Sequence, residues 1–177
     1  VFGRYPANFQ IQDTACRGVQ RGCHRSLAIV NETMFYKARS GICAFDGSLP
    51  VDASIALGSE VYFDAVGGAI GNKYYVSMRD VTERWHLFVF DTAKRMWHKE
   101  DNLHAAAFCA CKGELYCIDD DAKNIITMLG SGEKDTAPVS WEAETGNLGI
   151  STPDMKYLSG LTLRLSLAKD SKLEIYA

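Results

Sequence analysis

Several features that would assign a protein to a class are scarce in this sequence. Its 177 residues contain no apolar run close to the roughly 20 residues that a membrane-spanning helix needs. The 19 basic and 22 acidic residues nearly cancel, to a net charge of -3, so no field of one sign would gather nucleic acid or anionic lipid. The composition therefore predicts no membrane and no nucleic-acid partner.

Cysteine is also sparse, with six residues in the chain. Small secreted domains that depend on disulfides carry a denser framework, so free thiols in a reducing compartment are the simpler expectation. Cys109 and Cys111 stand two positions apart in a predicted strand and therefore share one of its faces. Because free cysteine is commonly buried as a small hydrophobe, we expect both side chains in the core.

Residue types that often mark a metal or catalytic site are present, but not at the spacing that such a site requires. No Cys or His partner at metal-ligand spacing accompanies any of the four histidines: His24, His86, His98 and His104. The run Asp119 to Asp121 lacks the spaced ligands and the glycine of an EF-hand loop, so we interpret it as a polar hairpin turn. We predict that the protein is not an enzyme and has no catalytic residue, cofactor or metal site.

Three glycines cluster at Gly67, Gly68 and Gly71. Neither the Lys-Ser/Thr pair of a phosphate loop nor a helix pattern follows them, and the chain contains no Gly-x-Ser-x-Gly elbow. We interpret the glycine cluster as a flexible connection.

Strand patterns occur throughout the chain, whereas helical periodicity is absent. Short runs rich in Val, Ile, Phe and Tyr lie between Gly, Asn and Asp turns. The predicted strands are residues 27–30, 34–37, 42–45, 61–66, 73–78, 86–90, 107–111, 114–118, 125–129, 139–145 and 161–167. The pattern predicts an all-β, antiparallel protein.

The strands repeat at a nearly constant interval. Residues 31–36, 71–76 and 112–117 each combine a short turn with an aromatic strand, and Phe35, Tyr75 and Tyr116 follow one another at 40 and 41 positions. A period of about 40 residues with about four short strands per unit is typical of a β-propeller blade. The repeat predicts about three propeller-like blades, in a partial ring, over residues 1–137. An Asp after the second aromatic strand of a unit, as in Asp46 and Asp91, should accept backbone N–H bonds in the turn that follows.

The repeat is not renewed after about Trp141. Residues 161–167 alternate Leu with polar residues, as in one layer of a sandwich, and 169–172 would turn this strand into a hairpin. Residues 138–177 are therefore expected to begin a C-terminal β-sandwich-like module. Val1 is not an initiator Met and the final strand pattern runs to Ala177 without a closing turn, so we expect a chain truncated at both ends.

Aromatic and acidic residues leave two alternatives open. Exposed Trp85 and Trp97 would suit a ligand or interface site, for instance a host-surface carbohydrate-binding module. Glu142 and Glu144 share a strand face and, with the Asp119 to Asp121 run, are the least implausible carboxylates for a glycosidase on a propeller scaffold. Their neighbours offer no support for catalysis.

A resemblance to bacteriophage and prophage structural proteins of Firmicutes extends over nearly the whole chain. It rests on residues 26–36 (SLAIVNETMFY), 41–50 (GICAFDGSLP), 72–78 (NKYYVSM), 87–92 (LFVFDT), 96–101 (MWHKED), 113–116 (GELY), 139–144 (VSWEAE) and 156–159 (KYLS). The resemblance implies a virion- or tail-associated propeller and transfers no catalytic residue. It implies a place in the virion, or in the bacterial host cytoplasm as a prophage product.

Taken together, these patterns predict a non-catalytic assembly platform. Its partners would be other virion or tail proteins or a second copy of the chain, because an incomplete ring leaves open edges that favour pairing with another chain. A glycan remains a possible ligand.

Overall fold

The computed structural model describes residues 15–128, 160, 162–165 and 171–175. The chain divides into two compact units, Val1–Lys134 and Asp135–Ala177. All strands of the described residues belong to the first unit. The predicted sandwich-like module and the boundary at 137/138 fall largely on residues outside this description.

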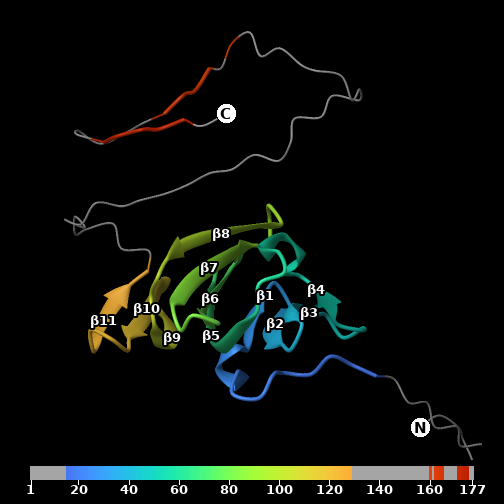
Figure 1. Cartoon of the computed structure of the whole chain (residues 1–177). Helices are drawn as coiled ribbons and strands as arrows, with labels where there is room; N and C mark the ends of the chain where they lie inside the picture. Colours follow the sequence, from blue (N-terminus) through green and yellow to red (C-terminus); the bar gives the residue numbers. More distant parts are fainter. Residues whose placement is uncertain (1–14, 129–159, 161, 166–170, 176–177) are drawn as a thin grey trace, which may run out of the picture. The chain divides into compact units, whose positions relative to one another are not determined.

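Three antiparallel sheets make up the first unit and confirm the all-β, blade-like prediction (Figure 1). The first sheet contains β1 (Ala28–Val30), β2 (Thr33–Ala38), β3 (Gly41–Phe45) and β4 (Val51–Asp52). The second contains β5 (Tyr62–Ile70), β6 (Lys73–Asp80), β7 (Trp85–Asp91) and β8 (Met96–Asp101), and the third contains β9 (Ala105–Cys111), β10 (Glu114–Asp119) and β11 (Asn124–Thr127). In each sheet the strands pair in sequence order, and short 3-10 turns, η2 (His24–Ser26) and η3 (Ile55–Leu57), precede β1 and β5.

The sequence repeat corresponds to a two-residue hairpin that opens every sheet. The turns Asn31-Glu32, Gly71-Asn72 and Lys112-Gly113 join the first strand of a sheet to the second. Each turn contains a residue at positive φ, such as Asn31 at 47° and Gly71 at 56°. Positive φ at the loop positions gives the turn a backbone twist that matches the twist of the two antiparallel strands. The same kind of two-residue turn therefore sets the strand register at the start of each sheet.

Aspartates close several of the later turns, as the sequence predicts. Asp46 Oδ1 accepts the Ser48 N–H at 3.0 Å, and Asp91 Oδ1 accepts the Ala93 N–H at 3.0 Å. Asp119 Oδ1 does the same for the Asp121 N–H at 2.9 Å, which confirms the acidic run as the hairpin turn between β10 and β11. In each turn the aspartate carboxylate accepts a backbone N–H that has no partner in the sheet, because the strand pairing ends there.

The interpretation of Gly67 and Gly68 as a flexible connection is wrong, because both lie inside β5. This strand packs between β1 and β9 and is the point where the three sheets meet (Figure 1). A Cβ at Gly67 would lie 2.5 Å from the Ser26 carbonyl oxygen, and one at Gly68 would lie 2.4 Å from Phe108 Cβ. Glycine is required here by the close approach of neighbouring chain segments on both sides.

Two hydrophobic cores lie on opposite faces of the second sheet. Tyr74 and Val76 pack against the first sheet, whereas Tyr75 packs against the third, so β6 is buried on both faces. The same alternation in β7 places Phe88 in the first core and Val89 in the second. Burial on both faces explains why these strands read as nearly continuous apolar runs. Within the described ranges, no helix has the length and apolarity to cross a membrane.

Candidate binding surfaces

Trp97, one of the two tryptophans predicted to serve a ligand or an interface, packs between the first and second sheets. Its indole Nε1–H donates to the Ala53 carbonyl oxygen at 2.6 Å. The ring lies 4.9 Å from that of Phe90 and edge-on to that of Tyr74. Because its hydrogen bond and its ring contacts are made inside the unit, Trp97 ties β8 to the first sheet.

Trp85 lies at the other end of the second sheet and on its other face. Its ring stacks on the His104 imidazole, with 4.0 Å between centroids and 12° between planes. The strand alternation of β7 places Trp85 on the side of Leu87 and Val89, toward the third sheet. The structure therefore does not bring the two tryptophans together, and one face of the Trp85 indole is already covered.

Acidic residues surround the stacked imidazole. His104 Nδ1 lies 2.8 Å from Asp121 Oδ1, and its Nε2 lies 3.7 Å from Asp120 Oδ2. Lys123 also contacts Asp120, at 2.8 Å, and its hydrogen bond and charge, helped by the charge of His104, hold the pKa of this carboxyl below its usual value. The cluster links the connection before β9 to the turn between β10 and β11.

Two further histidines, His86 and His98, each pair with a carboxylate in the second sheet. His86 Nε2 is 2.8 Å from Asp80 Oδ2, and His98 Nε2 is 3.0 Å from Glu100 Oε1. Among the residues that the structure describes, no three His, Cys, Asp or Glu side chains converge as a metal site would require. Glu142 and Glu144, the carboxylates of the glycosidase alternative, lie outside the described residues.

The outer side of the third sheet carries an exposed, mostly apolar surface, which we term the open face. Phe108, Leu115, Cys117 and Ile126 pack toward the second sheet, so the alternating positions point the other way. The open face consists of Ala107, Cys109, Cys111, Glu114, Tyr116, Ile118, Ile125 and Thr127, which face one another in the strand register. Ile118 is 44% exposed and Ile125 is 70% exposed.

The predicted burial of Cys109 and Cys111 is wrong, although the two share a face as expected. Both thiols are exposed on the open face, because no other sheet of the described residues packs there. Cys117, on the opposite side of the same sheet, is fully buried. Burial, followed by the charge of Asp119, raises the pKa of the Cys117 thiol to about 11, so this thiol stays neutral.

Equivalent positions in the three sheets show why the open face is unusual. Phe35 and Tyr75, which occupy the same place in β2 and β6 as Tyr116 in β10, are 3% and 1% exposed. In each case the next sheet along the chain covers the ring. Ile118 and Ile125 beside Tyr116 have no such cover among the described sheets.

The outer side of the first sheet is closed by the chain that precedes it. The Tyr36 hydroxyl donates to the Arg17 carbonyl oxygen, and Val19 forms a β-bridge with Ala38. Arg17 also pairs with Asp52 at 3.4 Å. Tyr36 and Ala38 are buried as a result, so the two outer sides of the unit differ.

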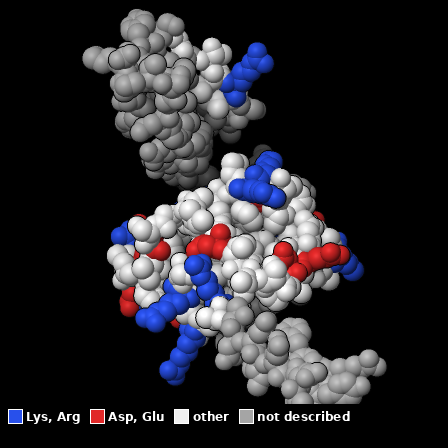
Figure 2. Space-filling model, turned by 90° about the vertical axis from the view of Figure 1, so that its right-hand side faces the viewer, with Lys and Arg blue, Asp and Glu red and all other residues white. Residues whose placement is uncertain are grey.

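Charges on the side of the molecule seen in Figure 2 are mixed. Figure 2 shows Lys and Arg and Asp and Glu in separate small groups over the described surface, with uncharged residues between them. This arrangement agrees with the small net charge of the sequence and offers no extended basic patch on that side.

Comparison of the chain with protein-family models and with curated proteins found no match. The site is therefore interpreted from its own geometry.

Proposed function

We propose that this chain is a phage- or prophage-derived structural protein that acts as a non-catalytic assembly platform through its open face. The observation that supports the proposal is the exposure of Ile118 and Ile125 on a sheet whose counterparts are covered. Exposed apolar surface of this kind marks an interaction site, since covering it removes hydrocarbon from water.

The partner available to the purified chain is a second copy. The open face is uncharged at Cys109, Tyr116, Ile118 and Ile125, and its one acidic residue, Glu114, lies at the hairpin end opposite Cys111. Two such faces can therefore bring their uncharged centres together while Glu114 stays at the edge of the contact. Packing of the same face from both copies gives a closed two-fold pair, the commonest symmetry of soluble oligomers. The outer side of the first sheet is a weaker candidate because residues 17–20 already cover much of it.

Oligomeric mass tests the proposal. We expect sedimentation equilibrium to detect dimers of the chain, and the double variant Ile118→Asp/Ile125→Asp to weaken association at least about tenfold. Both side chains are exposed in the monomer, so the variant should keep its fold, as circular dichroism can check. Ile55→Asp is the matched control, because Ile55 is 79% exposed on η3 and lies away from the open face.

Two results would count against the proposal. One is a strict monomer at the highest soluble concentration. The other is a dimer that Ile55→Asp weakens as much as the double variant does.

The glycan-binding alternative receives less support from the geometry. Trp97 uses its indole nitrogen inside the unit, and His104 covers one face of Trp85. A sugar platform usually presents a free aromatic face. Loss of glycan-array binding in Trp85→Ala would revive this alternative, whereas Trp97→Ala would report on folding.

A further inference from the structure

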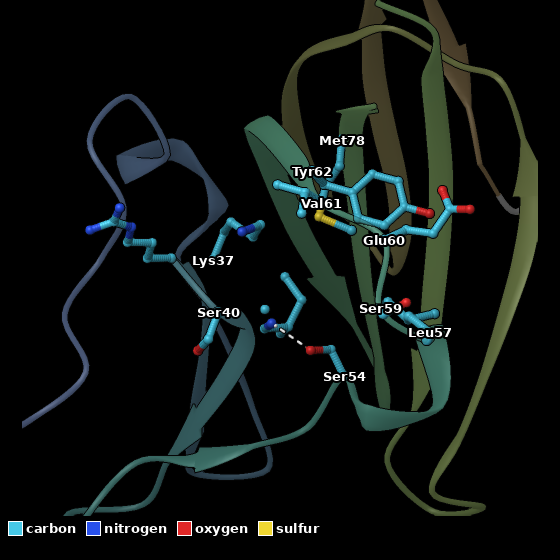
Figure 3. A pocket seen from close by; sticks show the side chains of 13 residues that line it. Lys37, Ser40, Ser54, Leu57, Ser59, Glu60, Val61, Tyr62 and Met78 are labelled. Atoms are coloured by element: carbon cyan, nitrogen blue, oxygen red, sulfur yellow. Dashed lines mark hydrogen bonds between the residues drawn. The ribbon is translucent and has the colours of Figure 1, made fainter. Parts of the chain in front are cut away.

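A cavity of about 170 Å³ lies between the first and second sheets, at the end where β2 turns into β3 (Figure 3). Its walls come from the end of β2, from the connection between β4 and β5, and from β6. Ile42 and Met78 form a buried apolar part, to which the half-buried Leu57 adds. Ser54 and Tyr62 supply hydroxyl groups to the same walls.

Lys37 is the unusual member of this wall. The residue is only 2% exposed, and Figure 3 shows its side chain directed into the cavity. Its Nζ donates to Gln20 Oε1 at 2.8 Å and to the Ala38 carbonyl oxygen at 2.6 Å, and both acceptors are neutral. In the part of the chain that the structure describes, no carboxylate oxygen lies within 4.0 Å of Nζ.

A lysine at this position is not required by the blade fold. The equivalent residue of the second sheet, 40 positions later, is Ser77. Its hydroxyl donates to the Leu103 carbonyl oxygen at 2.6 Å and accepts the Ala105 N–H at 3.2 Å, which ties the next connection to the sheet. Lys37 instead places a third ammonium donor beside a cavity, and a buried cation without a counter-ion is costly.

The surroundings favour an anion with a short hydrocarbon part. An engineered cavity of about 150 Å³ accepts benzene, so this volume suits about six non-hydrogen atoms. Burial, and then the charges of Glu60 and Asp80, raise the pKa of the Tyr62 phenol, which is therefore a neutral donor. Glu60 and Arg39 are both exposed residues at the cavity and carry opposite charges, so water screens them and they largely offset each other.

We propose that this cavity binds a small aliphatic monocarboxylate, whose carboxylate pairs with the Lys37 ammonium while its hydrocarbon part contacts Ile42, Leu57 and Met78. A carboxylate at Nζ would complete the third hydrogen bond and supply the missing counter-charge. The hydrocarbon part would lie against the apolar part of the wall and remove it from water. The site is independent of the open face and of its proposed role in assembly.

The probes are butyrate and its neutral isostere butyramide, both of six non-hydrogen atoms. We expect butyrate to raise the melting temperature in a concentration-dependent way, because a ligand of the native state stabilises it. Butyrate should also shift the Cε resonance of Lys37 in NMR spectra. Butyramide at the same concentrations should do neither, and inorganic phosphate should compete only weakly, because it has no apolar part.

Two variants separate charge from space. Lys37→Met keeps the length of the side chain and removes the charge, and should weaken butyrate binding at least about tenfold. Leu57→Phe leaves Lys37 in place and fills part of the cavity, so it should also weaken butyrate binding. This second variant tests the site if Lys37→Met does not fold. Equal effects of butyrate and butyramide on the wild type, no effect of butyrate up to high millimolar concentration, or unchanged butyrate binding in Leu57→Phe would each overturn the proposal.

Discussion

The tightest constraint on a single residue lies at Gly68, where the second sheet meets the third. Phe108 from β9 lies against the backbone of β5, in the space that a side chain at position 68 would otherwise occupy. Gly67 has the same relation to Ser26 on the other side of the strand. Adjacent residues of a strand point to opposite faces of the sheet. The two glycines therefore let the first sheet approach β5 on one face and the third sheet approach it on the other.

Substitution of Gly68 should be costly for this reason. In Gly68→Ala the new Cβ would be 2.4 Å from Phe108 Cβ and 2.7 Å from its Cγ. We expect a loss of about 1–3 kcal/mol in the free energy of unfolding, the usual range for overpacking. Urea denaturation measures it, and Gly18→Ala is the matched control because a Cβ there would meet nothing within 4 Å. Equal stability of the two variants would mean that β5 and β9 do not pack as described.

At the scale of the elements, the loop between β6 and β7 depends on one aspartate. Asp80 Oδ1 accepts the N–H groups of Thr82 and Arg84, and Oδ2 lies 2.8 Å from His86 Nε2. The His86 contact, followed by the Thr82 hydroxyl and the two backbone N–H groups, lowers the pKa of the Asp80 carboxyl well below its ordinary value of 3.8. The ionised carboxylate thus closes the turn between these two central strands of the second sheet.

This arrangement predicts a particular acid sensitivity. Because the pKa of Asp80 is lower in the folded than in the unfolded chain, its stabilising effect is complete above the unfolded value of about 4 and is lost as the pH falls below it. Asp80→Asn should therefore lower the melting temperature at neutral pH and flatten its decline below about pH 4. Asp101→Asn, an exposed site at the end of β8, controls for the loss of one charge. A decline with pH in Asp80→Asn as steep as in the wild type would contradict this role.

At the scale of the whole molecule, every residue of the two large cores lies between Cys23 and Met128. The described fold thus draws its hydrophobic stabilisation from the first compact unit, Val1–Lys134. Its two outer sides differ: residues 17–20 cover one, and the open face forms the other. This asymmetry directs the proposed association to the third sheet.

A chain that ends at Lys134 should consequently keep the blade structure. We expect a β-type circular dichroism spectrum and a cooperative thermal transition within a few degrees of that of the full chain, since both cores are retained. The full chain at the same concentration is the reference. Loss of cooperativity on removal of residues 135–177 would show that the first unit does not fold by itself.

Much of the fold follows from local patterns in the sequence. Apolar alternation predicts most of the strands, and the spacing of Phe35, Tyr75 and Tyr116 predicts the three blade-like sheets that the strand pairing shows. The aspartate turns at Asp46 and Asp91 were also predictable, because an Asx turn needs only residues two or three positions apart. Several strand bounds differ from the predicted ones only at the ends, as for β5, which continues through its glycines to Ile70. The short β4 was not predicted, and residues 162–165 of the predicted strand 161–167 form no strand.

The candidate surfaces were less accessible to sequence reasoning. A Lys at position 37 of an alternating strand is expected to be an exposed charge, and no neighbouring residue in the sequence indicates a cavity. The prediction for Trp97 and Trp85 rests on their size and chemistry, but their partners Ala53 and His104 come from other elements of the fold. The open face could have been inferred only from the repeat itself, since the described residues contain no fourth sheet to cover the third.

The sequence by itself therefore determined the strand period, the hairpin turns, the 40-residue repeat and the all-β class, since each depends on residues close together along the chain. Only the tertiary structure decided which faces are covered: it buries Cys117 and Lys37, exposes Cys109 and Cys111, and places Gly67 and Gly68 inside the strand where three sheets meet. The physical reason is that burial depends on the sheet that packs opposite, which lies tens of residues away in the chain and has no signature at the residue that it covers.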